Sequence, residues 1–225
     1  MKNTQDFRSW NRDKWEDKNQ AMYQTYAENR WPWFNESLDP DIEEFMSKVV
    51  RNSLEILDLG TCSGSQAIEL ARLGHRVTGT DISPTALEQA QQAARREPGL
   101  ALRFLLDDIT ASTLAEHQYD MVLDRGCYHS ICAFQHEEYV AGVRRVMKRG
   151  GVLLLKTMSS DETRFIAHDT IGGRVVQMPY HFSREELRGL LAPHFEILQM
   201  RDSFFYSKVV EPPARARLVV LRERS

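Results

Sequence analysis

The sequence has 225 residues, of which 42% are hydrophobic and 27% are charged, and its formal net charge at pH 7 is −3. These values are typical of one soluble domain, 1–225, with a sizeable core, and they exclude a disordered or fibrous chain. A membrane-spanning helix is excluded because no apolar run approaches ~20 residues, and dispersed Lys and Arg argue against a nucleic-acid partner.

The N-terminal segment, 1–38, is polar and unusually rich in aromatic residues. It resembles neither a signal nor a transit peptide, so we expect a cytoplasmic protein. All four tryptophans lie in the first 33 residues. One interpretation is that helices of this segment dock an aromatic face on the rest of the domain. The other is a helical lid that closes over a ligand and excludes water, with Tyr26, Trp31 and Trp33 as candidate lid residues; both can hold together.

From about residue 39, helical patterns alternate with short apolar strands. Asp39 and Pro40 are typical of a helix start, as are Ser83 and Pro84. The predicted helices are 41–51, 66–73, 84–96 and 136–147. The predicted strands are Leu54–Leu59, His75–Thr80, Leu100–Leu106, Tyr119–Leu123 and Gly151–Lys156. This alternation predicts a parallel sheet with helices on both faces.

The pattern changes in the last third of the chain. Residues 160–173 are expected to be irregular, and Arg174–Pro179 to be extended. Ser183 and Glu186 form a capping box for a helix that ends near Ala192 and Pro193. The runs Phe195–Phe205 and Arg215–Arg222 follow one another without a helix, so they should pair antiparallel.

The loop after the first predicted strand reads Gly60-Thr61-Cys62-Ser63-Gly64. Gly60 and Gly64 allow a tight turn and a close approach to a ligand, and the next helix offers free amide donors. In open parallel sheets, ligands bind at the carboxyl ends of the strands, near the point where strand order reverses. An ordinary strand-to-helix turn is the alternative for the loop alone.

Carboxylates recur at successive strand ends. They are Asp58, Asp81, Asp108 and Asp124. Unpaired carboxylates at one sheet edge repel one another, so such a set favours a polar, partly cationic ligand. At the position of Asp81, an acidic side chain can accept hydrogen bonds from ribose hydroxyls. The pattern indicates a nucleoside that carries an amino acid.

These motifs resemble those of the class I S-adenosylmethionine-dependent methyltransferases. The resemblance rests on Glu55–Gly64, Val77–Ser83, Asp107–Ile109, Tyr119–Val122 and Met147–Leu154, and it covers roughly 39–225. It implies a Rossmann-like α/β fold with a seven-stranded, mostly parallel sheet that ends in an antiparallel strand pair. Cys62 departs from the family, which often has Gly at this position.

The resemblance also implies cofactor contacts for S-adenosylmethionine, with S-adenosylhomocysteine as product. Asp58 and the loop residues Gly60, Thr61, Cys62 and Gly64 would face the methionine part and the nearby ribose. Asp81 would hold the ribose hydroxyls, with Ile82 packed on the adenine. Asp108 would meet the adenine amine beside Ile109, and Asp124 would complete the acidic set. Taken singly, Ile82 and Ile109 are more typical of core packing.

The acceptor would bind near Asp124-Arg125-Gly126-Cys127-Tyr128-His129, which follows the fourth strand. Gly126 permits an unusual turn that would place Tyr128 and His129 at the reacting centre. A neutral histidine could take a proton from a thiol, hydroxyl or amine. The alternative is that His129 fixes the loop, because methyl transfer often needs only positioning. Phe165 and His168, in the irregular stretch 160–173, could shape the same pocket.

Loose similarity to thiopurine, thiol, halide and tellurite methyltransferases favours a small-molecule acceptor. No metal site is expected, since the three cysteines form no zinc-ligand pattern. The protein is expected to be a monomer or a homodimer. Three alternatives stay open: a nicotinamide oxidoreductase, a non-catalytic cofactor-binding module, and a methyltransferase for a protein or nucleic acid. The first would require the motif G-x-G-x-x-G after the first strand.

Overall fold

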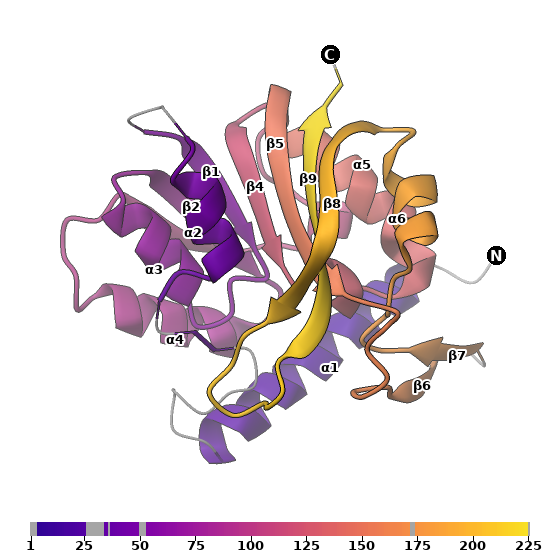
Figure 1. Cartoon of the computed structure of the whole chain (residues 1–225). Coiled ribbons are helices and arrows are strands. Elements are labelled where there is room, and N and C mark those ends of the chain that lie inside the picture. The colour runs from indigo at the N-terminus through magenta and orange to yellow at the C-terminus, as the bar shows by residue number, and fades with distance from the viewer. Residues whose placement is uncertain (1–3, 26–33, 36, 50–52, 172–173, 225) are drawn as a thin grey trace.

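A computed structural model describes residues 4–25, 34–35, 37–49, 53–171 and 174–224. Within these residues, seven strands form one sheet in the order β3-β2-β1-β4-β5-β9-β8, and β6 and β7 form a separate hairpin (Figure 1). The strands are β1 (Glu55–Leu59), β2 (Arg76–Asp81), β3 (Leu102–Leu106), β4 (Tyr119–Arg125), β5 (Met147–Met158), β6 (His168–Ile171), β7 (Arg174–Gln177), β8 (Phe195–Phe205) and β9 (Ala214–Glu223). The helices are α1 (Thr4–Thr25), α2 (Pro40–Met46), α3 (Ser65–Arg72), α4 (Pro84–Ala94), α5 (His136–Val146) and α6 (Arg184–Leu191).

The sheet is parallel from β3 to β5 and antiparallel where β9 pairs with β5 and with β8. The predicted α/β fold and the predicted closing strand pair are therefore confirmed. The chain builds β1, β2 and β3 outward in one direction and then returns to place β4 on the other side of β1. Strand order thus reverses between β1 and β4, which is where a parallel sheet opens a ligand crevice.

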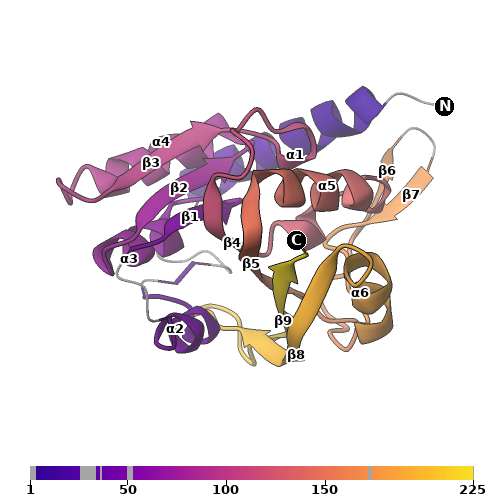
Figure 2. The same ribbon diagram turned by 90° about the horizontal axis from the view of Figure 1, so that it is seen from above.

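Alternate residues of each central strand enter two separate cores, as expected for a sheet that is covered on both faces. On one face, Leu57 and Val122 pack with residues of α5 and α6. On the other face, Ile56 and Met121 pack with residues of α2 and α3. Figure 2 shows the helices on the two sides of the sheet, with α2 and α3 opposite α5.

Helix starts follow the predicted caps. The side chain of Asp39 accepts a hydrogen bond from Asp41 N at the start of α2, and the side chain of Ser83 accepts one from Ala86 N at the start of α4. Ser183 and Glu186 form the predicted capping box of α6. The prediction of one helix over 41–51 was wrong in length, because α2 ends at Met46.

The prediction that 160–173 is irregular was partly wrong, because this stretch contains β6. The β6–β7 hairpin buries Ile171 and Val176 against Cys132, with Trp10 of α1 packed on this small cluster. Its stability therefore depends on tertiary contacts rather than on a local apolar pattern.

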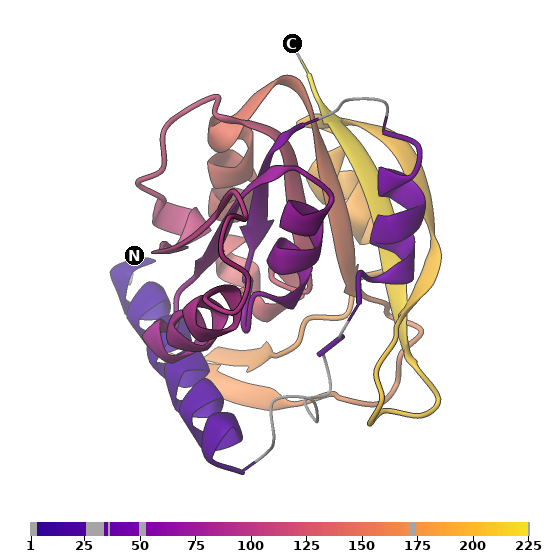
Figure 3. The same cartoon turned by 90° about the vertical axis from the view of Figure 1, so that its left-hand side faces the viewer.

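The first helix, α1, runs along the edge of the sheet at which β1, β2 and β4 end (Figures 1 and 3). Its position agrees with the predicted helical segment at the N-terminus. Across the described ranges, no helix combines the length and the apolar character that a membrane crossing requires.

Candidate active site

The loop after β1 turns through three residues with positive φ: Gly60 (63°), Cys62 (51°) and Gly64 (78°). Glycine adopts this conformation readily, whereas a cysteine there is strained. The amide of Cys62 donates to Oδ2 of Asp81 at 3.0 Å, and the amide of Thr61 donates to the carbonyl of Thr80 at 2.9 Å. The strained turn is thus tied to the end of the neighbouring strand β2.

Asp58 lies beneath this loop and is 3% exposed. Its carboxylate accepts a hydrogen bond from Oγ1 of Thr61 at 2.6 Å. Burial, followed by the nearby charges of Asp124 and Asp81, raises the pKa of Asp58 to about 7. A buried carboxyl group among like charges favours a cationic partner.

Asp81, at the end of β2, accepts hydrogen bonds from two backbone amides, those of Cys62 and Ser83, each at 3.0 Å. Burial raises its pKa, and the charge of Glu16 adds to the effect. Asp108, after β3, accepts from the amide of Thr110 at 2.9 Å and from its hydroxyl at 2.7 Å. Both carboxylates are therefore held by local turns.

The charges of the four predicted aspartates all act on one side chain, the thiol of Cys127 after β4. Burial raises the pKa of Cys127, and the charges of Asp124, Asp81, Asp108 and Asp58 all raise it further. Cys127 also lies against the turn after β1, since a Cβ atom on Gly60 would lie 3.1 Å from the Cβ of Cys127. The acidic edge expected from the sequence is therefore one cluster at the place where strand order reverses.

Asp124 differs from the other three in the number of hydrogen bonds that its oxygens accept. It accepts hydrogen bonds from the amides of Gly126, Cys127 and Tyr128 and from the hydroxyl of Tyr139, at 2.5 to 2.9 Å. Burial raises its pKa to about 6 against these hydrogen bonds. The expected direct contact with a cofactor is therefore not favoured, and Asp124 shapes the loop that carries His129.

The two isoleucines expected beside the adenine have different surroundings. Ile82 is half-buried. Ile109 belongs to the core cluster under α5, and its carbonyl lies so close to Gly142 that a Cβ atom there would clash at 2.0 Å. The core-packing interpretation therefore applies to Ile109.

His129 is held in one tautomer by the backbone. Nδ1 of its ring accepts the amide hydrogen of Met158 at 3.0 Å. Burial, followed by His181, Lys18 and Arg125, lowers its pKa to about 3. The ring is therefore neutral, and its hydrogen is on Nε2. This geometry does not favour His129 as a general base, because Nδ1 already accepts the amide hydrogen of Met158 and Nε2 carries the ring hydrogen.

Contrary to the prediction, the side chain of Tyr128 does not reach the reacting centre. Its side chain is fully buried and stacks on Phe182 with ring centroids 4.8 Å apart, next to His136 and Tyr139. Burial raises the pKa of its hydroxyl. The helical turn at Tyr128–Ser130 directs Tyr128 into the core, so it is a packing residue rather than a catalytic one.

The lid residues Tyr26, Trp31 and Trp33 lie outside the described residues, but α1 of the same segment is described. Nε1 of Trp15 donates to the carbonyl of Ser130 at 3.3 Å, after β4. Glu16 accepts hydrogen bonds from the hydroxyls of Ser83 and Thr85, after β2. Arg8 donates to the carbonyl of Thr110 at 2.9 Å, after β3. One helix thus bridges three strand ends.

Phe165 and His168, expected to shape the same pocket, are both exposed. The ring of Phe165 lies under the guanidinium group of Arg164 at 5.1 Å, and His168 begins β6. Their side chains therefore lie largely in solvent, and their part in shaping the pocket stays a prediction.

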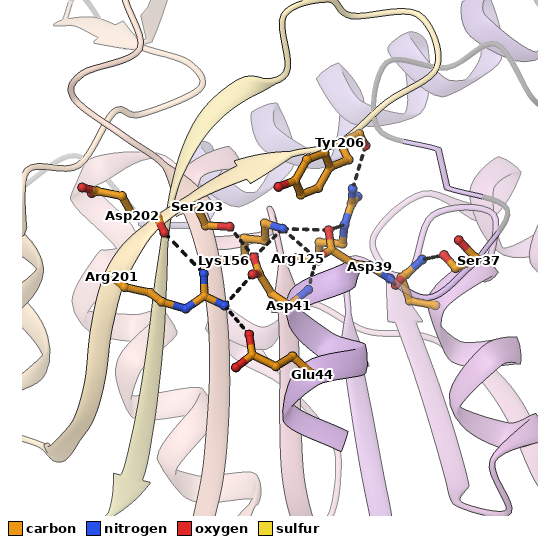
Figure 4. A network of polar contacts seen from close by, with 11 residues as sticks. Ser37, Asp39, Asp41, Glu44, Arg125, Lys156, Arg201, Asp202, Ser203 and Tyr206 are labelled. Atoms are coloured by element: carbon orange, nitrogen blue, oxygen red, sulfur yellow. Dashed lines mark hydrogen bonds and ion pairs between the residues drawn. The ribbon is translucent and has the colours of Figure 1, made fainter. Parts of the chain in front are cut away.

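A buried ion network next to the site was not predicted (Figure 4). Lys156, near the end of β5, is 1% exposed and binds Asp39 at 2.6 Å and Asp41 at 2.7 Å. Arg125, at the end of β4, binds the other oxygen of Asp39 at 2.7 Å, and Arg201 of β8 binds Asp41 at 2.6 Å. A lysine at the end of an apolar strand was the available sequence signal, since buried lysines are rarely unpaired.

Comparison with known proteins gives consistent results. A family model described as a methyltransferase domain matches residues 56–151. An uncharacterized methyltransferase of Schizosaccharomyces pombe is 31% identical over 104 residues, which are 46% of this chain and 71% of that protein.

Two solved structures share the fold over nearly the whole chain. One, from work on the conversion of a disulfide bond into a thioacetal group during echinomycin biosynthesis, has a TM-score of 0.74 at 22% identity and covers 93% of each chain. The other is the 1,6-didemethyltoxoflavin-N1-methyltransferase of Burkholderia thailandensis, with bound 1,6-didemethyltoxoflavin and S-adenosylhomocysteine. It has a TM-score of 0.69 at 18% identity and covers 100% of this chain and 92% of that chain.

Proposed function

This chain belongs to the class I S-adenosylmethionine-dependent methyltransferase family, and on that premise we propose that it methylates a small-molecule acceptor by in-line displacement. The cofactor supplies an electrophilic methyl group on a positively charged sulfur. The chain's own residues bind the cofactor, orient the acceptor and exclude water.

The observation that carries the proposal is the carboxylate cluster around Cys127. Asp58 is buried among like charges, and both it and Asp81 have raised pKa values. Such a cluster suits a cofactor that carries a sulfonium and an ammonium group, because a bound cation offsets the repulsion between the carboxylates. Asp58 would face the cationic part and Asp81 the ribose hydroxyls, with Asp108 on the adenine side.

The position of α1 supports a small acceptor over a macromolecular one. Its side chains contact the segments after β2, β3 and β4 at the same time, so the helix covers the edge at which the acceptor must enter. A protein or nucleic-acid substrate would need that edge open. One structural neighbour was solved with a small heteroaromatic compound bound, and the same acceptor class fits this covered site.

Calorimetric titration with S-adenosylmethionine tests the cofactor site. We expect Asp81→Asn to weaken binding by roughly 1–3 kcal/mol, because it removes a hydrogen-bond acceptor for the ribose and a negative charge. Asp13→Asn, which changes an exposed carboxylate of α1 that is paired with Arg12, should bind like the original protein. Equal affinities for all three proteins would contradict the assignment.

A methyl-transfer assay with two sets of acceptors tests the acceptor class. One set holds small thiols, phenols and heteroaromatic amines, and the other holds protein extract and nucleic acid. Turnover in the small set alone supports the proposal. Transfer to the macromolecular set, or tight cofactor binding with no transfer to either set, would favour the two alternatives.

A further inference from the structure

His181 lies in the segment that connects β7 to α6. Nδ1 of its ring lies 2.8 Å from the carbonyl oxygen of Glu162. Because a carbonyl can only accept, Nδ1 carries the hydrogen, and Nε2 keeps its lone pair as long as the ring is neutral. Nε2 is buried and has no hydrogen-bond partner within the described part of the chain. Buried acceptors without a partner are rare in native proteins, and a catalytic role is one of their established causes.

The backbone around His181 is fixed to both segments that carry the acceptor side of the site. The amide of Tyr180 donates to the carbonyl of His129 at 2.7 Å, and the amide of Phe182 donates to the carbonyl of Met158 at 2.9 Å. Met158 in turn donates its amide hydrogen to Nδ1 of His129. After burial, His181 is the next cause of the lowered pKa of His129. The two imidazole rings therefore lie near each other, at the carboxyl ends of β4 and β5.

The two rings present opposite hydrogen-bonding groups. His129 offers an N–H on Nε2, because its Nδ1 accepts the amide hydrogen of Met158. His181 offers a lone pair on Nε2, because its Nδ1 donates to the carbonyl of Glu162. A hydroxyl or a thiol can use both rings at once, since it accepts one hydrogen bond and donates another. A halide ion or a tertiary amine has no hydrogen to donate to His181.

The groups around His181 allow its ring to take up a proton. Burial lowers its pKa, whereas the carbonyl and the carboxylate of Glu162 and the backbone of Phe165 raise it. Hydrogen bonds from Arg164 lower the pKa of Glu162 to about 2, so this carboxylate is ionised. The titratable groups that α1 and β4 contribute around the neighbouring ring of His129 are Lys18 and Arg125, of which Arg125 is paired with Asp39. The ring of His181 is thus neutral at rest, and an imidazolium would form beside a carboxylate.

We propose that His181 is the general base of the reaction: its Nε2 takes the proton of a hydroxyl or thiol acceptor that the Nε2–H of His129 orients. This proposal rests on the proposed function and narrows its acceptor class. A lone pair of the acceptor oxygen or sulfur forms the new bond to the methyl carbon. The carbon–sulfur bond of the sulfonium breaks, and its electron pair stays on sulfur. The acceptor proton moves to Nε2 of His181, and the imidazolium releases it to water after the product has left.

The tautomers of the two rings can be observed without any acceptor or turnover. The full chain is labelled at its histidine ring nitrogens, and NMR signals are assigned by their loss in His181→Asn and in His129→Asn. At about pH 8 we expect the ring hydrogen on Nδ1 of His181 and on Nε2 of His129. A ring hydrogen on Nε2 of His181 would overturn the proposal, because that nitrogen could not accept a proton.

His181→Asn separates a base from a residue that only fixes its loop. The amide nitrogen of asparagine can still donate to Glu162, but asparagine cannot take up a proton. With 4-methylphenol and phenylmethanethiol, which are protonated at about pH 7, we expect kcat to fall about a hundredfold while the melting temperature changes little. His194→Asn is the matched control and should keep kcat, because His194 precedes β8 at the opposite end of the sheet. Unchanged kcat in His181→Asn, or equal losses in both variants, would contradict the assigned role.

The pKa of the acceptor gives a readout that a merely structural role would not change. 4-Nitrophenol and thiophenol are largely ionised at about pH 8 and need no base, so His181→Asn should slow them less than about tenfold. For the two protonated acceptors, kcat/KM of the original protein should fall as the pH drops through one shared inflection below about 6.5, because Nε2 must be unprotonated.

In His181→Asn this shared inflection should disappear, and kcat/KM should instead rise toward the pKa of each acceptor. An inflection that already follows the acceptor in the original protein, or no transfer to any of the four compounds, would overturn the proposal. Failure to bind S-adenosylmethionine would instead overturn the proposed function.

Discussion

The carboxyl group of Asp58 shows how strongly one residue can couple the site to pH. Its pKa is raised to about 7 by burial and by two neighbouring aspartates, whereas an exposed aspartate ionises near pH 4. The stability that comes from the protonated form is complete below about pH 4 and is lost as the pH rises through 7. The unliganded protein is thus destabilised by this carboxylate at neutral pH, which a bound cation would offset.

Asp58→Asn should therefore raise the melting temperature of the unliganded protein at about pH 8 but not at about pH 4. The shift of the Asp58 pKa corresponds to at most ~4 kcal/mol. For the original protein, S-adenosylmethionine should bind tenfold or more weakly at about pH 5.5 than at about pH 8, because the carboxyl must first lose its proton. Asp58→Asn should flatten this dependence; a pH-independent affinity in the original protein would refute the argument.

The sequence allowed the acidic strand ends and the turn at Gly126 to be predicted, because both depend on local order in the chain. The tautomer of His129 could not be predicted, since it depends on the amide of Met158, 29 residues away. The saturation of Asp124 was missed for a similar reason. Its fourth hydrogen bond comes from Tyr139 on α5, so the number of its partners depends on how that helix packs.

At the scale of elements, the ion network of Lys156 joins the start of α2 to three strands. Lys156→Met would leave Asp39 and Asp41 buried without their main cation, and we expect a loss of about 3–5 kcal/mol in the free energy of unfolding. Lys148→Met is a matched control, because Lys148 is 41% exposed in its pair with Asp120 and should cost under about 1 kcal/mol. Urea denaturation measures both, and similar losses would show that the network is not stabilised as a buried unit.

A helix or strand could be predicted where its own residues carried a local sequence signal. The strands of the sheet have apolar runs, and α4 and α6 have serine caps. The β6–β7 hairpin has alternating exposed and buried residues and is held by packing against Cys132 and Trp10. Its second strand, β7, matches the extended segment predicted at Arg174–Pro179, whereas β6 lies in the stretch that was predicted to be irregular.

At the scale of the whole molecule, the position of the tryptophans allows a test of whether 1–225 unfolds as one domain. All four lie in the first 33 residues, so tryptophan fluorescence reports the N-terminal segment, whereas far-UV circular dichroism reports mainly the sheet and its helices. We expect both signals to change at the same temperature, because α1 is bonded to three strand ends. A fluorescence transition at a clearly lower temperature would mean that the lid melts separately.

The place of β9 in the sheet has a consequence for how the protein is made. A ribosome releases β8 before β9, yet β9 lies between β8 and β5, and among the described strands it is the partner of both. Until Ala214–Glu223 has emerged, the outer edge of β5 has no partner strand in the nascent chain, although β8 has already been synthesised. Exposed strand edges recruit other chains, so the newly synthesised protein is most prone to aggregate in the interval just before β9 emerges.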